Sequence, residues 1–273
     1  MDLLPSDHKF PFDIHNKLYK DVFYDEIEYN RYTSYINGTL KAYEKHHHFP
    51  NIYTDYRDDW GYEITSHGFR CNSEYDKIDL MVFGCSHTFG VGAPKEDTWG
   101  YKLSKQLSVP EENYCNLGKA GFGIYQVLMV AQTAILRHKP GMVFVLWPDP
   151  SRGIISDKHG QIRLLSTNSI QQPNIMETFG DDGDTKSEAW VNWIYKNLSY
   201  EKATMRFASH MLQQLCDQVG CLLVEDTVRQ YTPLLNDPDH LARGRDLLHF
   251  EGLVHSRIAT QFYDLLVKKQ SNL

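Results

Sequence analysis

A serine flanked by glycines follows a short apolar segment in the first half of the chain. Residues 78–83 are largely apolar and predict a strand, and Gly84-Cys85-Ser86 follows at once. A strand that ends at Gly-x-Ser must turn sharply, which lifts the Ser86 hydroxyl and its own N–H toward a reacting carbonyl. The same pattern is typical of a turn in which a serine caps the next helix. The motif therefore predicts either a nucleophile or a helix cap.

An aspartate and a histidine three residues apart lie near the end of the sequence. Asp246 and His249 come just before residues 254–266, whose apolar side chains recur at helical spacing. On one short turn the histidine can accept the serine proton while the carboxylate orients the imidazole. A second pair of the same spacing, Asp237 and His240, lies nearby. Only the first pair directly precedes the helix that would fix it to the core, so we expect Asp246 and His249 to be the functional pair.

Glycines gather after a second short apolar segment. Residues 116–123 begin with an asparagine and contain glycines at positions 118, 121 and 123. Glycine lets the backbone approach a ligand closely and leaves N–H groups free to point at a developing oxyanion. The spacing is not that of a dinucleotide-binding fingerprint, and residues 84–90 lack the lysine of a phosphate-binding loop. These glycines therefore favour an oxyanion site over a nucleotide site.

Together these three motifs resemble the SGNH (GDSL-type) hydrolase superfamily of esterases and lipases. The resemblance covers roughly residue 78 to the C-terminus and consists of Gly-x-Ser-x-Thr-x-Gly, an asparagine with glycines, and a late Asp-x-x-His, in that order. It implies that Ser86 is the nucleophile, His249 the general base and Asp246 its orienting partner. It also implies an oxyanion hole that includes the N–H groups of Ser86 and Gly121.

One motif of that family is altered in this chain. After the apolar run 142–147, where the family usually has Gly-x-Asn, the sequence continues with Pro148, Asp149 and, three residues later, Arg152. An ionised Asp149 beside an oxyanion would repel it. Arg152 carries a fork of donors that can reach an anion, so we expect it to be the third donor of the hole. A hole with only two donors, or a surface arginine paired with Asp149 or with solvent, are the alternatives.

Composition narrows the class of protein further. The chain has 273 residues, 41% of them hydrophobic, which is enough for one sizeable core and a smaller appendage. A net charge of −7 without a long basic run argues against nucleic acid and anionic membrane surfaces as partners. No apolar stretch reaches the roughly 20 residues of a membrane span. The three consecutive histidines 46–48 do not share a face, so we expect no metal site there. We also expect no cofactor.

The cysteines and the N-terminus predict a cytoplasmic protein. The five cysteines are an odd number without regular spacing, which predicts reduced thiols. The first residues lack the basic and apolar regions of a signal peptide. The sequence does not indicate an oligomeric state.

Strand and helix patterns alternate along the second half of the chain. Strands are expected at 78–83, before Asn116, at 142–147 and at 221–224, and helices at about 96–107, 124–135, 203–219 and 254–266. Such alternation predicts an α/β protein with a mostly parallel sheet between two helix layers. The three-layer α/β/α, flavodoxin-like fold implied by the family resemblance is of this type. Ligands then bind beyond the carboxyl ends of the strands, where Ser86 and Gly121 fall.

Two regions lie outside this alternation. Residues 1–77 hold 10 of the 17 tyrosines but few aliphatic runs, so we expect an N-terminal extension that wraps a hydrolase-like domain of residues 78–273. Residues from about 153 to 197 are too many for an ordinary connection and predict an insertion that acts as a lid or binding surface. Trp190 and Trp193 in this insertion either stack on a sugar or acyl group or anchor the insertion itself.

The sequence therefore predicts a serine hydrolase that cleaves a carboxylic ester through an acyl-enzyme on Ser86. The expected substrate is a small-molecule or glycan ester, such as a carbohydrate O-acetyl ester. Two alternatives stay open. One is a non-catalytic protein of the same fold, a binding or virion assembly component whose altered third motif has cost it activity. The other is an O-acyltransferase, which passes the acyl group to an alcohol in place of water.

Overall fold

A parallel sheet of four strands forms the centre of the protein. The computed structural model describes residues 69–70, 77–91, 93–119, 121–150, 152–156, 162–165, 198–233 and 252–271. The strands of the sheet are β1 (Leu80–Gly84), β2 (Tyr114–Asn116), β3 (Met142–Trp147) and β6 (Leu222–Thr227), in the order β2-β1-β3-β6. The chain passes from β1 to β2 on one side and returns to β3 on the other. The carboxyl end of β1 therefore lies at the point where the strand order reverses, which is where doubly wound folds bind ligands.

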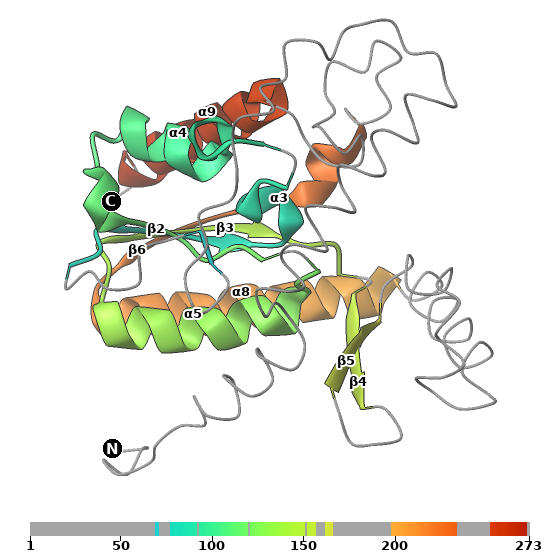
Figure 1. Ribbon diagram of the computed structural model, residues 1–273. Helices are drawn as coiled ribbons and strands as arrows, with labels where there is room; N and C mark the ends of the chain where they lie inside the picture. The colour runs from blue at the N-terminus through green and yellow to red at the C-terminus, as the bar shows by residue number, and fades with distance from the viewer. Residues whose placement is uncertain are drawn as a thin grey trace, which may run out of the picture.

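Helices cover both faces of this sheet. They are α3 (Ser86–Phe89), α4 (Trp99–Gln106), α5 (Ile124–His138), α8 (Leu198–Val219) and α9 (Gly252–Gln270), with short 3-10 turns η1 (Lys95–Asp97), η2 (Glu111–Asn113) and η4 (Val228–Gln230). Helices α5 and α8 lie along one face, and α4 and α9 along the other (Figure 1). The predicted three-layer α/β/α arrangement is present in the described residues.

The strands are apolar throughout because each of their faces packs against helices. In β1, Met81 and Phe83 join the core under α5 and α8, whereas Leu80 and Val82 join the core under α4 and α9. Successive side chains of a strand point to opposite faces, so a strand buried on both sides must be apolar at every position. The same alternation runs through β3. This is why the continuous apolar runs in the sequence located β1 and β3 correctly.

Helix α8 turns a different face to the core than its largest apolar residues suggest. Thr204, Ala208, Leu212 and Cys216 are buried against the sheet and α5, four residues apart in each case. Phe207 is 56% exposed and Met211 43% exposed. The helical spacing of apolar residues fixed the position of this helix but not its rotation. Small side chains such as Ala208 let the helix approach the sheet closely, and hydrophobicity ranking alone passes over them.

A separate hairpin begins the segment that the sequence predicts as an insertion. It consists of β4 (Gly153–Ser156) and β5 (Ile162–Leu165), which pair antiparallel with each other. Within the described residues, neither strand pairs with the four-stranded sheet. The rest of the predicted insertion and most of residues 1–77 lie outside the described residues. The division into extension and hydrolase-like domain therefore stays a prediction.

The cysteines are not all reduced. Cys85, Cys216 and Cys221 are free and buried, but Cys115 in β2 is disulfide-bonded. The prediction of five reduced thiols is therefore wrong at Cys115. An odd number of cysteines shows only that at least one of them has no partner within the chain. It therefore could not exclude a disulfide between two others. Among the described helices, none is long and apolar enough to cross a membrane.

Two neighbouring residues of α8 test the rotation of this helix. Leu212 is 1% exposed and its neighbour Met211 43% exposed. We expect Leu212→Ala to lower the free energy of unfolding by about 2–5 kcal/mol, because it leaves a cavity between α8 and the sheet. Met211→Ala should lower it by less than about 1 kcal/mol. Urea denaturation followed by circular dichroism measures both, and equal losses would contradict the observed rotation.

Candidate active site

Ser86 stands at the tip of β1, where the strand turns into α3. Gly84 closes the strand, and a Cβ atom at that position would lie 2.7 Å from the Leu146 carbonyl oxygen of β3. Cys85 occupies the N-cap position, and its side chain packs into the core. Ser86 is the first residue of the helix and is 4% exposed. The alternative in which this serine caps the helix is therefore wrong.

The asparagine at the end of β2 joins the serine turn to the glycine loop. The Asn116 side-chain amide donates to the Thr88 carbonyl oxygen at 2.8 Å, and its side-chain oxygen accepts from the Gly118 N–H at 2.9 Å. The Lys119 N–H also donates to the Gly84 carbonyl oxygen at 3.2 Å. Because the asparagine is buried, these bonds are shielded from competing water. They hold the glycine loop directly against the turn that carries the serine.

Gly118 and Gly121 have separate structural roles in this loop. A Cβ atom at Gly118 would lie 2.6 Å from the Phe89 nitrogen, so only glycine permits the contact with α3. Gly121 has a φ of +82°, in the left-handed region that favours glycine. The predicted oxyanion donor thus sits in a loop whose backbone path is set by its glycines. Its role as a donor remains a prediction.

An arginine that the motifs did not single out closes the other end of the serine helix. The Nη1 atom of Arg70 donates to the carbonyl oxygens of Phe89, Gly90 and Ala93, at 3.0, 3.1 and 3.1 Å. A cation at a helix C-terminus also interacts favourably with the helix dipole. Arg70 lies before β1, in the region predicted to be an extension. No local sequence pattern links it to residues 19 to 23 positions away.

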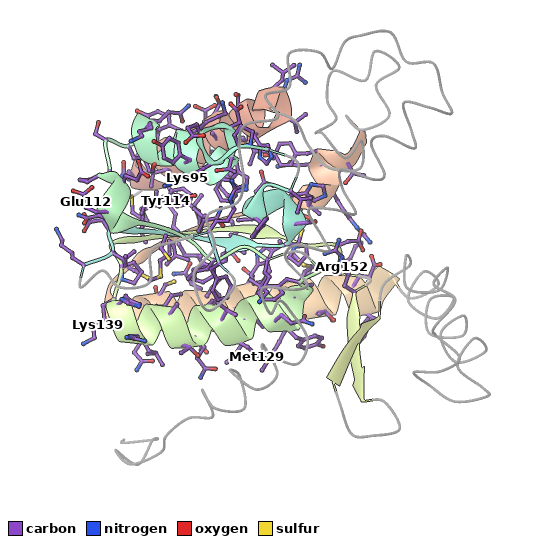
Figure 2. All side chains as sticks on the ribbon, viewed as in Figure 1. Lys95, Glu112, Tyr114, Met129, Lys139 and Arg152 are labelled. Atoms are coloured by element: carbon purple, nitrogen blue, oxygen red, sulfur yellow. The ribbon has the colours of Figure 1, made fainter. Side chains whose placement is uncertain are left out.

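Arg152 lies beside the glycine loop. Its Nη1 atom donates to the Phe122 carbonyl oxygen at 2.8 Å, and its N–H donates to the Asp149 carbonyl oxygen at 3.2 Å. A Cβ atom at Gly123 would lie 3.0 Å from the Arg152 carbonyl oxygen, so the two loops are in close contact. Figure 2 shows Arg152 at the end of the sheet where α3 lies, with Lys139 at the opposite end. The guanidinium is therefore held on the glycine loop, and its role as a third oxyanion donor stays a prediction.

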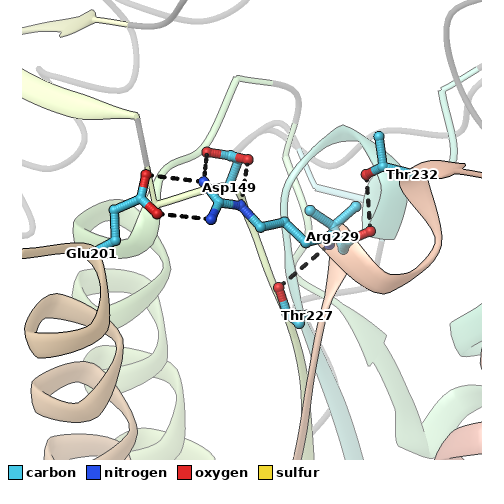
Figure 3. Close-up of polar contacts among 6 residues, drawn as sticks. Asp149, Glu201, Thr227, Arg229 and Thr232 are labelled. Carbon is cyan, nitrogen blue, oxygen red and sulfur yellow. Dashed lines mark hydrogen bonds and ion pairs between the residues drawn. The ribbon is translucent and has the colours of Figure 1, made fainter. Parts of the chain in front are cut away.

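The Asp149 carboxylate is paired with Arg229. The Arg229 Nε donates to Oδ2 of Asp149 at 2.9 Å, and Nη2 donates to Oδ1 at 3.2 Å (Figure 3). Asp149 lies two residues beyond Trp147 of β3, and Arg229 two residues beyond Thr227 of β6, and Trp147 and Thr227 are register partners. Because each residue lies two positions beyond one member of this register pair, the side chains of Asp149 and Arg229 come together. The sequence could not reveal this partner, because it did not show where β6 ends or how it pairs.

Several predicted site residues lie outside the described residues. These are Asp246 and His249, the competing pair Asp237 and His240, and the two tryptophans of the insertion, Trp190 and Trp193. The structure places the glycine loop against the serine turn and Arg152 on the glycine loop, and the roles of all these residues stay predictions. Of the residues that could ligate a metal, no group of three or more is found in the part of the chain that the structure describes.

The chain is similar to several solved structures of esterases. One is a psychrotrophic esterase from Pseudoalteromonas sp., with 12% identity over 71% of this chain and 100% of that chain and a TM-score of 0.35. A lipolytic protein of the G-D-S-L family from Veillonella parvula has 11% identity over 70% and 98% of the two chains, with a TM-score of 0.32. A family 3 carbohydrate esterase from Clostridium thermocellum has 15% identity over 70% and 96%, with a TM-score of 0.34.

No family model and no curated protein matches the chain.

A lysine is buried within the glycine loop. Lys119 is 1% exposed, and its Nζ lies 5.4 Å from the centre of the Phe69 ring. Burial lowers the pKa of its amine to about 7, from the usual 10.5. The folded protein therefore gives up this proton at a pH where the unfolded chain still holds it. In consequence the free energy of unfolding rises with pH across the window between about 7 and 10.5.

Replacing this lysine by methionine removes that dependence. We expect Lys119→Met to be more stable relative to the wild type at about pH 6 than at about pH 9.5, because only the wild type must bury a charge at low pH. Urea denaturation at both pH values gives the two differences. Lys202→Met, on the exposed side of α8, is the matched control and should show no such trend. A pH-independent difference for Lys119→Met would contradict the lowered pKa.

Proposed function

We propose that the protein is a serine hydrolase that cleaves a carboxylic ester through an acyl-enzyme on Ser86. The observation that carries this proposal is the attachment of the glycine loop to the serine turn through Asn116. It holds a hydroxyl nucleophile and a set of backbone N–H groups at one end of the sheet, at its switch point. Acyl transfer needs this combination, because the nucleophile and the oxyanion donors must flank the same carbonyl.

The proposed reaction follows the usual course of acyl transfer. The Ser86 hydroxyl oxygen attacks the ester carbonyl carbon while His249 takes the hydroxyl proton, and Asp246 orients the imidazole. The carbon–oxygen bond to the alcohol then breaks, and His249 returns the proton to the leaving oxygen. A water molecule, deprotonated by His249, then attacks the acyl carbon; the bond to the Ser86 oxygen breaks, His249 returns the proton to that oxygen, and the acid is released. Charge on the carbonyl oxygen is stabilised by the N–H groups of Ser86 and Gly121 and by Arg152.

The proposed substrate is a small-molecule or glycan ester, such as a carbohydrate O-acetyl ester. Trp190 and Trp193 are the residues that would stack on a sugar ring, since the face of an indole ring packs well on apolar ring surfaces. The proposed chemistry uses only side chains and backbone groups of this chain, and no cofactor has a step in it.

The nucleophile and the base are tested together. Ser86→Ala and His249→Ala should each lower turnover of p-nitrophenyl acetate by several orders of magnitude, and the double variant should be little worse than either. His240→Ala is the control and should have a mild effect. Labelling by a fluorophosphonate should occur in the wild type and be lost in Ser86→Ala. Equal rates for the wild type and Ser86→Ala would rule out the nucleophile, and a more severe loss in His240→Ala would select the other Asp-x-x-His pair.

A separate substitution tests the third oxyanion donor. Arg152→Ala should lower kcat by about 100-fold or more with little change in KM, because the donor acts mainly in the transition state. Arg206→Ala, on the exposed side of α8, removes an arginine elsewhere and should leave kcat unchanged. Steady-state kinetics with p-nitrophenyl acetate measures both. An unaltered kcat in Arg152→Ala would leave a hole of two backbone donors.

A further inference from the structure

We infer that Arg229 is a positioning residue that offsets the charge of Asp149 and so makes an aspartate tolerable beside the oxyanion. The inference rests on the proposed function and explains how the altered third motif is compatible with it. An aspartate replaces the neutral residue expected after β3, and its negative charge would oppose the charge that develops on the carbonyl oxygen. The structure supplies the compensating cation from the next strand.

The contact between the two side chains is bidentate. Two nitrogens of the Arg229 guanidinium donate to the two carboxylate oxygens of Asp149, at 2.9 and 3.2 Å. A planar fork of this kind fixes the orientation of the carboxylate as well as its charge. Hydrogen bonds to Glu201 and to Asp149 raise the pKa of Arg229 above its usual value, so the cation persists at every accessible pH.

The same guanidinium also binds a second carboxylate. Its Nη1 and Nη2 atoms donate to Oε2 and Oε1 of Glu201, at 2.7 and 3.0 Å (Figure 3). The side chain of Glu201 is 5% exposed and stands in the first turn of α8, where the helix dipole stabilises a negative charge. The negative charge of Glu201 is thus stabilised by the α8 helix dipole as well as by Arg229. For Asp149, the ion pair with Arg229 provides compensation.

Asp149 is close to the site through its backbone. Its carbonyl oxygen accepts from the Arg152 N–H, and Arg152 in turn is bound to the glycine loop through the Phe122 carbonyl oxygen. Strand β3 lies next to β1, with Leu146 opposite Gly84. Asp149 therefore follows Leu146 by three residues, and Ser86 follows Gly84 by two, at the same edge of the sheet. An uncompensated carboxylate here would act on the oxyanion and on the Arg152 guanidinium alike.

The test compares the loss of Arg229 in two backgrounds. In the wild type, Arg229→Gln should lower kcat for p-nitrophenyl acetate by about 10-fold or more, with little change in KM. In an Asp149→Asn background, where position 149 no longer has a charge to offset, the same substitution should cost less than about threefold. A purely structural role for Arg229 would cost the same in both backgrounds.

A matched control breaks the other half of the same network. Glu201→Gln removes the second carboxylate from Arg229 but leaves the pair with Asp149, so its kcat should stay within about threefold of the wild type. If Glu201→Gln lowers kcat as much as Arg229→Gln, the network acts through packing and the inference is overturned. Arg229→Lys keeps the cation and should also retain kcat within about threefold, which provides the test if Arg229→Gln does not fold.

The outcomes separate this inference from the proposed function. Fluorophosphonate labelling of Ser86 in the wild type reports the function itself, and its absence together with absent turnover overturns both. Labelling and turnover in the wild type with an unchanged kcat in Arg229→Gln overturns the inference alone. Equal losses from Arg229→Gln in both backgrounds, or a loss of 10-fold in Arg229→Lys, do the same.

Discussion

The fold of the candidate site depends on the parallel pairing of β1 between β2 and β3. This pairing aligns the carboxyl ends of three strands at one edge, so the loops that follow them are forced into contact. The side chain of Asn116 then satisfies the polar groups that this contact buries. Without the shared edge, Ser86 and Gly121 would be unrelated residues on two distant loops. The placement of the candidate site therefore follows from sheet topology, and the side chains refine it.

Three arginines hold the loops at this edge, each in a different way. Arg70 binds the carbonyl oxygens at the end of α3, Arg152 binds the glycine loop, and Arg229 binds two carboxylates. A guanidinium suits this work because its five donors lie in one rigid plane and its charge is permanent. All three come from segments that follow or precede strands, where backbone carbonyls lack partners in the sheet. Backbone carbonyl oxygens thus contribute to the contacts at this edge as much as side chains do.

The sequence predicted what depends on local pattern and could not predict what depends on register. Apolar runs located β1 and β3, and the first two motifs placed Ser86 and Gly121 after strand ends. That Ala208 is buried and Phe207 exposed could not be predicted, because spacing does not fix the rotation of a helix. Arg229 was missed because its relation to Asp149 exists only once β3 and β6 are paired. The roles of Asp246 and His249 stay predictions from the motif alone.

The crowding around the glycines bears on the interpretation of mutational libraries. At Gly84 and Gly118 any side chain would collide with a backbone atom of a neighbouring segment, and Gly90 needs a φ of +79°. A deep mutational scan would therefore show all three positions as intolerant for reasons of packing and backbone conformation alone. Intolerance at Ser86 has a different signature, because serine can be replaced by alanine without loss of packing space. Measuring protein abundance together with activity separates the two kinds of position.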